Sequence, residues 1–352
     1  MMSRPGSRFT RCSAVLAIVV CAMSTSSIPP RADAERWSRQ MLGVATVATM
    51  LPGTDIGREV DAIAAVGVNA IRISVKWNLI EPDLGGQFRW DAVDLAVRTA
   101  LDHKLQILMT LEGPAPRWAQ DPATDPAANG NPPFDARDFG TFANAAASRY
   151  LTATSCWEIW NEPNVPHYLD PPTVDTYLPL LREASDGIRR SGSVAPIVTG
   201  GTSSNLVGMR DIDFVQELYA RGAGTYFDGI AVHPYTYPLP LSFTSGLGTI
   251  VPQIRQVMHD HGDDHKQVWI TEYGQPTGNT PVSSSELDQA AKLKDAVTNA
   301  RGIPWIGGFF IFNTVDLAPD SSDPDMNFGL YRYDFTPKPA VAAVRSAVVT
   351  DR

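Results

Sequence analysis

Apolar residues in this chain fall into short runs that alternate with longer amphipathic segments. The short runs are nearly continuous in apolar residues, which is typical of parallel strands buried on both faces. Eight of them predict strands at 41–48, 69–74, 105–111, 156–162, 195–201, 229–233, 267–272 and 305–313. Apolar positions at helical spacing predict a helix after each strand, at 55–66, 91–103, 135–150, 174–190, 212–221, 250–261, 283–301 and 340–349.

Strict alternation of strands and helices predicts a parallel sheet covered by helices. Eight such units over this length match a single (β/α)8 barrel, the TIM barrel. An open, doubly wound sheet is the competing fold, but no glycine-rich nucleotide fingerprint follows the first strand. The chain shows no internal repeat and no low-complexity linker, so we expect one α/β domain.

The first 34 residues have the character of a targeting segment. Basic residues precede an apolar run at 14–23, and Ala32-Asp33-Ala34 resembles a signal-peptidase site. The run is too short for an ordinary membrane span, although an uncleaved N-terminal anchor is an alternative. We therefore expect residues 1–34 to be a signal peptide or anchor, residues 35–352 to be the catalytic domain, and the protein to be secreted or at the cell surface.

Composition narrows the possible partners. The 352 residues carry a formal net charge of -9 and no long basic run, which argues against nucleic acid as a partner. Cys156 alone would remain after removal of the first 34 residues, so no intramolecular disulfide is expected. Because Cys156 lies inside an apolar strand, we interpret it as a buried structural thiol.

Polar and aromatic side chains gather where the predicted strands end. In a (β/α)8 barrel the chemistry lies at the C-terminal ends of the strands, so these residues form a candidate site. The set is Arg72 and Trp77, Glu112 and Trp118, Asn161 and Glu162, His233 and Tyr235, Glu272, and Phe310, Phe312 and Asn313.

Two of these strands end in a glutamate, Glu162 and Glu272. A pair of carboxylates across a cleft with aromatic walls is what glycoside hydrolysis requires, because one group donates a proton and the other attacks or stabilises the anomeric carbon. Carboxyl groups about 5 to 5.5 Å apart would retain the anomeric configuration and a wider gap would invert it. The sequence leaves that separation open.

Longer motifs around both glutamates resemble a known family. The run Trp157-Glu-Ile-Trp-Asn-Glu-Pro-Asn164 resembles the strand-four motif of the clan A glycoside hydrolases, and Trp269-Ile-Thr-Glu-Tyr-Gly274 resembles their strand-seven motif. Further matches extend over nearly all of the predicted domain, at 67–72, 116–119, 233–235, 328–331 and 338–340. Within the clan, the chain is most similar to family 39 and cellulase-like members.

The resemblance implies a role for each main residue. Glu162 would be the general acid/base and Glu272 the nucleophile of a retaining β-glycosidase. Asn161 would hydrogen-bond the 2-hydroxyl of the sugar, Arg72 would keep Glu272 ionised, and Tyr235 would orient Glu272. The implied substrate is an oligo- or polysaccharide, and no metal or cofactor is expected.

The aromatic and histidine positions complete this expectation. His233 would line the acid/base side, and Trp77 and Trp118 would offer stacking faces for sugar rings. Clan members commonly carry a tryptophan at the end of the last strand, whereas this chain has Phe310 or Phe312 in that region. A phenyl ring stacks on a sugar but lacks an N–H donor.

Two other functions are compatible with parts of the sequence. One is a catalytically inactive, carbohydrate-binding barrel, which would not need both glutamates together with Asn161 and Arg72. The other is a metal-dependent hydrolase that uses His259, His261 and His265. We interpret this histidine cluster as a solvated helix end.

Overall fold

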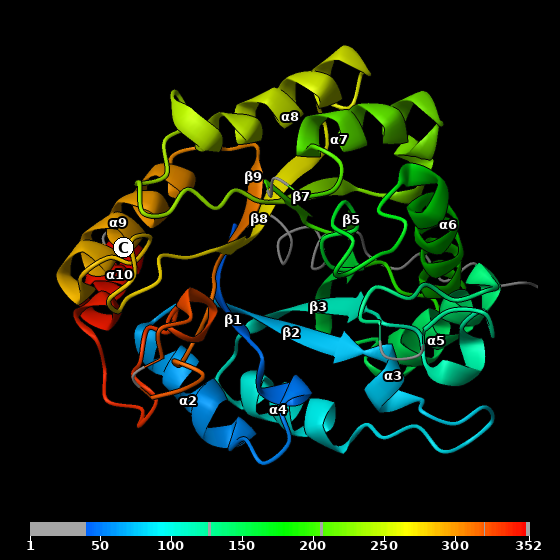
Figure 1. Cartoon of the computed structure of the whole chain (residues 1–352), viewed down its shortest axis with the longest axis horizontal. Coiled ribbons are helices and arrows are strands. Elements are labelled where there is room, and N and C mark those ends of the chain that lie inside the picture. Colours follow the sequence, from blue (N-terminus) through cyan, green and yellow to red (C-terminus); the bar gives the residue numbers. More distant parts are fainter. Residues whose placement is uncertain (1–39, 126–127, 205–206, 320, 350–352) are drawn as a thin grey trace, which may run out of the picture. The chain divides into compact units, whose positions relative to one another are not determined.

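Parallel strands close into a barrel with helices packed around it in the computed structural model of this chain (Figure 1). The structure describes residues 40–125, 128–204, 207–319 and 321–349, and this barrel unit begins at Arg39. The predicted single (β/α)8 barrel is therefore confirmed. The predicted signal peptide or anchor at 1–34 lies outside the described residues.

The strands follow one another around the barrel in a simple order. All pairs are parallel, in the order β5-β4-β3-β2-β1-β9-β8-β7-β6, and a pairing of β5 with β7 closes the barrel. The strands in the described part of the chain are β1 (Met41–Thr46), β2 (Ala70–Lys76), β3 (Gln106–Glu112), β4 (Thr154–Ile159), β5 (Ile197–Thr199), β6 (Thr202–Ser203), β7 (Gly229–His233), β8 (Gln267–Tyr273) and β9 (Ile306–Ile311).

The strand predicted at 195–201 ends at Thr199 as β5, and β6 follows only after Gly200 and Gly201. A Cβ atom on Gly201 would lie 2.2 Å from His233 Nε2 and 2.7 Å from Thr271 Oγ1. Only glycine fits there, because two side chains of the barrel interior occupy the space beside the backbone. The interruption therefore makes room for polar groups that the site uses.

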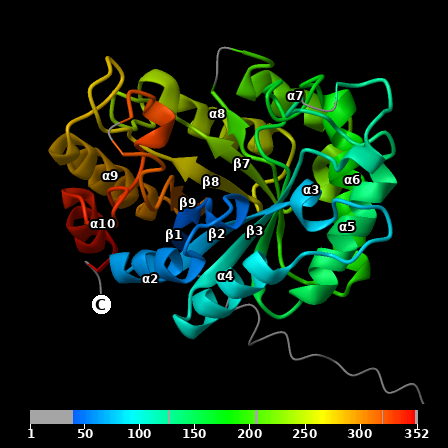
Figure 2. The ribbon, with the colours of Figure 1, turned by 60° about the horizontal axis from the view of Figure 1, so that its bottom comes forward.

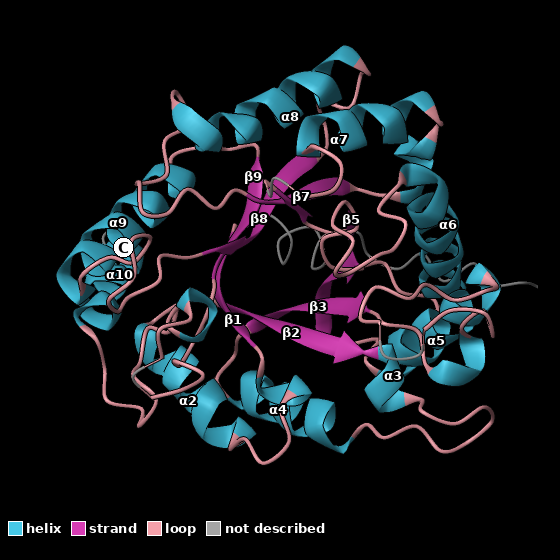
Figure 3. Ribbon diagram, viewed as in Figure 1, coloured by secondary structure: helices cyan, strands magenta, loops and turns pink. Residues whose placement is uncertain are grey.

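Helices cover the outside of the barrel (Figures 2 and 3). Several begin at a side-chain cap: Asp55 accepts from Arg58 N and Ser285 accepts from Asp288 N. No described helix is long and apolar enough to cross a membrane. The helices are α2 (Ile56–Val66), α3 (Trp77–Ile80), α4 (Asp91–Asp102), α5 (Ala136–Arg149), α6 (Val174–Arg190), α7 (Asp211–Ala220), α8 (Ile250–Asp260), α9 (Glu286–Arg301) and α10 (Pro339–Val349).

The barrel interior is built in layers. Each of eight strands contributes one residue to a closed apolar layer that consists of Met41, Ala70, Leu108, Cys156, Val198, Ala231, Trp269 and Phe310. Cys156 is free and buried there, and burial raises the pKa of its thiol, as expected of a structural cysteine.

Residues two positions further along a strand point to the same side, so the next interior layer can be deduced from the first. On five strands this layer is polar, in contrast to the apolar layer before it. Its members are Arg72, Thr110, Glu158, His233 and Thr271, all buried. A buried polar layer thus follows the apolar layer toward the C-terminal ends of the strands.

Candidate active site

Glu162 and Glu272 both lie at the C-terminal end of the barrel, but one is in a loop and the other is in a strand. Glu272 belongs to β8, as predicted. The strand β4 ends at Ile159, so Glu162 lies in the following loop rather than within a strand that extends to 162. Trp160 and Glu162 both have left-handed backbone conformations, with φ of 72° and 43°. Such conformations are strained for these residues and are found preferentially at functional sites.

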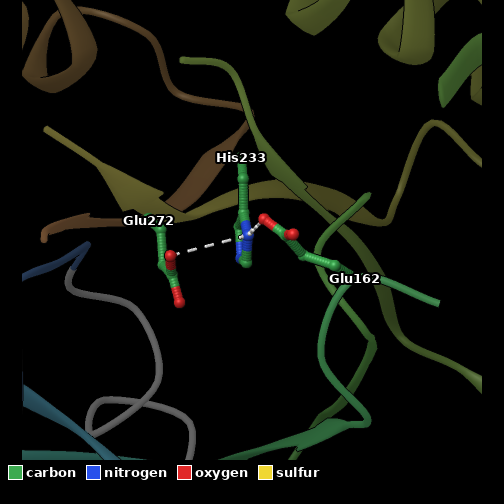
Figure 4. A group of neighbouring side chains, drawn as sticks. All are labelled: Glu162, His233 and Glu272. Atoms are coloured by element: carbon green, nitrogen blue, oxygen red, sulfur yellow. Dashed lines mark hydrogen bonds and ion pairs between the residues drawn. The ribbon is translucent and has the colours of Figure 1, made fainter. Parts of the chain in front are cut away.

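The imidazole of His233 lies between the two glutamates (Figure 4). Its Nδ1 atom is 2.9 Å from Glu162 Oε1 and 3.7 Å from Glu272 Oε2. One carboxylate oxygen of each glutamate and a ring nitrogen of His233 all lie within 4.8 Å of one another. The structure therefore brings the predicted acid, nucleophile and histidine into one site.

Arg72 holds the other side of Glu272. Its Nη1 donates to Glu272 Oε1 at 2.6 Å, and Tyr235 Oη donates to Glu272 Oε2 at 2.8 Å. Burial alone would raise the pKa of Glu272, but the charges of His233 and Arg72 and these hydrogen bonds outweigh it and hold the pKa below its usual range. A carboxylate kept ionised suits a nucleophile.

Asn161 is fixed by the same arginine, because Arg72 Nη2 donates to Asn161 Oδ1 at 3.0 Å. This bond engages the carbonyl of the side chain and leaves the amide NH2 available as a donor. Asn161 also lines a cavity of about 140 Å³, together with Lys76, Glu112 and Tyr168. The predicted contact of Asn161 with a sugar hydroxyl is compatible with this position.

Glu112 is buried in this cavity, and its Oε1 atom has no hydrogen-bond partner in the part of the chain that the structure describes. Burial raises the pKa of Glu112, although the charges of Lys76 and Arg72 oppose the shift. A carboxyl group with an unpaired oxygen in a cavity is suited to contact a hydroxyl of a ligand.

Tyr168 is a member of the site that the sequence did not suggest. It lies in the loop after β4 and lines the cavity beside Glu112 and Asn161. Burial raises the pKa of Tyr168, and the carboxylates of Glu162 and Glu272 raise it further. Its phenol therefore stays protonated and lies close to the catalytic pair. No strand end or motif marks this residue, so only the folded loop reveals it.

Glu158 is a second residue that the sequence did not suggest. This fully buried carboxylate accepts hydrogen bonds from Arg72, Thr110, Thr271 and the backbone of Gly201. It lies four residues before Glu162, within the motif that resembles the clan. The available signal was its phase: Glu158 follows the interior Cys156 by two positions, just as Arg72 follows Ala70.

Two of the predicted aromatic contacts are corrected by the structure. Trp77 is fully buried, packs against Phe142 with ring centroids 5.6 Å apart, and donates its indole N–H to Glu81. Phe310 belongs to the closed apolar layer of the barrel and is also fully buried. Neither ring can reach a sugar, because Phe310 lies in the apolar layer beneath the polar layer and Trp77 is packed against Phe142.

Phe312 and Trp118 remain partly exposed. Phe312 lies edge-on to Tyr235, with ring centroids 6.5 Å apart, and to Phe328 at 5.5 Å. It therefore lies beside Tyr235, the residue that donates to Glu272. Trp118 packs edge-on against Trp77 and donates to the backbone of Glu81, so one side of its indole stays open.

Asn313 is buried directly after Phe312, and neither atom of its side-chain amide has a hydrogen-bond partner among the described residues. A buried amide normally forms hydrogen bonds, so its free donor and acceptor are available to a ligand or water. This position is consistent with the predicted binding role.

Among the described residues, Glu162, His233 and Glu272 are the one group with donor atoms close enough to share a metal ion. Both oxygens of Glu272 are already engaged, one by Arg72 and the other by Tyr235. A metal ion would stand beside the fixed positive charge of the guanidinium, which is unfavourable. The three side chains therefore suit proton transfer better than metal binding.

The histidines at the end of α8, which are His259, His261 and His265, do not form a group that could share a metal ion in the described part of the chain. The exposed His259 pairs with Asp264 at 3.0 Å, and His261 stacks on Tyr219 with ring centroids 4.4 Å apart. This arrangement supports the interpretation of these histidines as part of a helix end.

The barrel and its paired glutamates define the class of (β/α)8 glycoside hydrolases. The model of the cellulase family, glycosyl hydrolase family 5, matches residues 42–308, and the chain belongs to this family. The predicted membership of clan A is thus confirmed. The family model that matches is that of family 5, whereas the motifs predict family 39 and cellulase-like members. No curated protein sequence matches the chain.

Solved structures of both families share the fold. A family 39 glycoside hydrolase from Bacteroides cellulosilyticus WH2 has a TM-score of 0.72 at 23% identity, over 90% of this chain and 64% of that one. A family 5 enzyme, GH5_18, from Streptomyces cattleya in complex with GlcNAc has a TM-score of 0.66 at 17% identity, over 88% and 79%. A family 39 β-xylosidase from Caulobacter crescentus has a TM-score of 0.64 at 16% identity, over 88% and 70%. The chain spans less than two thirds of the Bacteroides protein.

Proposed function

We propose that the protein is a retaining β-glycoside hydrolase in which Glu272 is the nucleophile and Glu162 the general acid/base. The observation that carries the proposal is the short distance between the two glutamates, whose nearest oxygens lie within 4.8 Å. Retaining enzymes hold their carboxyl groups about 5 to 5.5 Å apart, whereas inverting enzymes need roughly 6.5 to 9.5 Å to admit a water between carboxylate and sugar.

The reaction proceeds in two steps under this proposal. Glu272 attacks the anomeric carbon while Glu162 gives its proton to the oxygen of the leaving group, which breaks the glycosidic bond and forms a glycosyl ester. Glu162 then removes a proton from water, and the resulting hydroxide displaces Glu272 from the sugar. Arg72 and Tyr235 hold Glu272 in place and keep it ionised before the attack.

The substrate class we propose is an oligo- or polysaccharide with β-linked sugars. Tyr235 donates to Glu272, and the partly exposed ring of Phe312 lies edge-on to Tyr235; such rings stack on the apolar faces of sugars. The β-xylosidase from Caulobacter crescentus among the similar structures supports a β-linkage. Asn161 and Glu112 would contact hydroxyl groups from the adjoining cavity.

We also propose that the protein is exported, either secreted or held at the cell surface. The support is the basic and apolar N-terminal sequence with the Ala32-Asp33-Ala34 site. A polymeric substrate too large to enter a cell would require this location. N-terminal sequencing of the protein recovered from culture medium would identify the cleavage site, and exclusive recovery from the cytoplasm would contradict export.

The test is hydrolysis of defined β-linked polysaccharides and aryl β-glycosides by the wild type and by Glu272→Gln. We expect cleavage by the wild type only, with a β-configured sugar as the first product in NMR spectra. Glu217→Gln is a matched control, because Glu217 lies on α7 and pairs with Arg221. Equal cleavage by Glu272→Gln would contradict the nucleophile, and an α-configured first product would contradict retention.

A further inference from the structure

The buried carboxylate of Glu158 accepts hydrogen bonds on both oxygens. Oε2 accepts from Arg72 Nε and Thr110 Oγ1, both at 2.6 Å, and Oε1 accepts from Thr271 Oγ1 at 2.6 Å and Gly201 N at 3.2 Å. Four donors occupy the acceptor positions of an ionised carboxylate, and the guanidinium of Arg72 balances its charge. Glu158 is thus an acceptor only and has no proton to donate.

Thr271 has a single hydroxyl proton, and the structure determines where it points. Because Glu158 can only accept, the hydroxyl of Thr271 must donate to it. The same oxygen lies 3.0 Å from His233 Nε2, so in this second contact Thr271 must accept and Nε2 must carry the donated proton. Gly201 packs against this edge of the ring, where a Cβ atom would lie 2.2 Å from Nε2.

His233 can therefore gain or lose a proton only at Nδ1, which lies 2.9 Å from Glu162 Oε1. In the neutral ring, the lone pair of Nδ1 faces Glu162, accepts a hydrogen bond from its carboxylic acid and disfavours its ionised form. The opposite tautomer, with the proton on Nδ1, would donate to Glu162 and favour the ionised carboxylate. The tautomer of His233 thus determines whether the protonated or the ionised form of Glu162 is favoured.

We infer that Glu158 and Thr271 are positioning residues that hold His233 in its Nε2–H form and thereby keep the acid proton on the Glu162–His233 pair. The inference rests on the proposed function of Glu162 as general acid, but the tautomer itself is a property of the folded protein. The carboxylate of Glu158 is then connected by hydrogen bonds to both proposed catalytic glutamates. Arg72 connects it to Glu272, and Thr271 and His233 connect it to Glu162.

Other charges near His233 do not change this assignment. Within hydrogen-bonding distance, Nε2 has only the Thr271 hydroxyl among the described residues. Burial alone would lower the pKa of His233, but the nearby carboxylates outweigh it and the pKa is raised. The charged groups that face the ring from the surrounding elements are Glu158, Glu162, Glu272, Arg72 and Asp211.

The first test reads the tautomer directly and needs no substrate. Nitrogen-15 NMR of the full-length protein, labelled on histidine, is recorded over a range of pH and assigned with His233→Gln. We expect Nε2 of His233 to be protonated throughout and only Nδ1 to titrate. In Thr271→Val, neutral His233 should acquire a detectable Nδ1–H population. A wild-type ring with an unprotonated Nε2 would overturn the inference whether or not the protein hydrolyses glycosides.

The second test compares pH profiles of kcat/KM. Thr271→Val should move the basic limb to lower pH by about one unit, because the pair then loses its acid proton more readily. At neutral pH, kcat/KM of Thr271→Val should fall about tenfold for substrates with poor leaving groups and only slightly for activated aryl glycosides. Thr271→Ser keeps the hydroxyl and should restore the wild-type limb.

Thr110→Val is the matched control. Thr110 is equally buried and donates to the same carboxylate at 2.6 Å, yet in the described part of the chain it forms no hydrogen bond with His233. The basic limb of the pH profile of Thr110→Val should stay at its wild-type pH if Thr271 acts through the tautomer of His233. Equal shifts in Thr110→Val and Thr271→Val would overturn the inference, since the effect would then come from Glu158 or from general packing.

Discussion

Arg72 and Glu272 form a buried ion pair inside the barrel, with Arg72 Nη1 2.6 Å from Glu272 Oε1 and the arginine only 3% exposed. The same guanidinium also contacts Glu158 and Asn161. One arginine therefore places a positive charge beside Glu272, the proposed nucleophile, and fixes the side chain of Asn161, which precedes the proposed acid. Three nitrogens that each contact a different residue require the planar guanidinium, which lysine cannot reproduce.

Replacement of Arg72 by Lys should move the acidic limb of the pH–rate profile to higher pH. The pKa of Glu272 lies below its usual range partly because of Arg72, so its ionised form persists to low pH in the wild type. Loss of the hydrogen bond raises that pKa, and the nucleophile becomes protonated earlier as the pH falls. We expect a shift of about one unit.

The measurement is kcat/KM against pH on an aryl β-glycoside for the wild type and Arg72→Lys. The wild-type profile should be bell-shaped, with an acidic limb from Glu272 and a basic limb from the Glu162–His233 pair. Arg210→Lys serves as the control, because Arg210 pairs with Asp213 at the surface. An unmoved acidic limb in Arg72→Lys would show that the arginine does not set the ionisation of Glu272.

Replacement of Glu162 by Ala should slow the enzyme in a manner that depends on the leaving group. A general acid contributes roughly 10²- to 10⁴-fold, and activated aryl groups need little of this help. Azide should enter the space left by the side chain and give a β-glycosyl azide, which NMR identifies. An α-glycosyl azide would mean that the roles of Glu162 and Glu272 are exchanged.

Phe312 and Phe310 should respond differently to replacement by Ala. Phe312→Ala removes a partly exposed ring beside Tyr235, so KM should rise roughly two- to tenfold with little change in Tm. Phe310→Ala opens a cavity in the closed layer and should cost about 3 to 5 kcal/mol of unfolding free energy. Steady-state kinetics and thermal unfolding of both variants check this. A normal KM for Phe312→Ala would exclude the ring from substrate binding.

Replacement of Glu112 by Gln should affect substrate binding more than folding. The side chain is buried with one unpaired oxygen in the cavity beside Asn161, and burial raises its pKa. Glutamine keeps the shape but exchanges an acceptor for a donor, so KM should rise about fivefold, the effect of one hydrogen bond of about 1 kcal/mol. Kinetics and thermal unfolding test this, and an unchanged KM would remove Glu112 from the binding site.

Treatment with a strong chelator should leave hydrolysis unchanged. The only candidate metal-binding group in the described part of the chain has its Glu272 oxygens engaged by Arg72 and Tyr235. Activity is measured after dialysis against the chelator and again after addition of divalent cations. Loss of activity that a cation restores would contradict the two-glutamate mechanism and favour a metal-dependent one.

The sequence by itself determined the barrel and the placement of its main site residues. Near-continuous apolar strands that alternate with amphipathic helices have few packing solutions, and the C-terminal ends of parallel strands meet at one face. Glu272 could therefore be placed at the same end of the barrel as Arg72 and Tyr235, and the resemblance to clan A implied that both would contact it. The motif around Glu162 identified the other carboxylate, although the strand before it ends three residues earlier.

Tertiary structure alone decided the contacts inside the barrel. The register of β9 in the closed barrel places Phe310 in the buried apolar layer, whereas Phe312 follows the strand beyond that layer. The burial of Trp77 depends on its packing against Phe142 of α5. In the sequence, Glu158 is one acidic residue within a predicted strand. Its role emerges only where Arg72, Thr271 and Gly201 converge on it, because a hydrogen-bond network between distant segments is set by three-dimensional closure and not by local sequence.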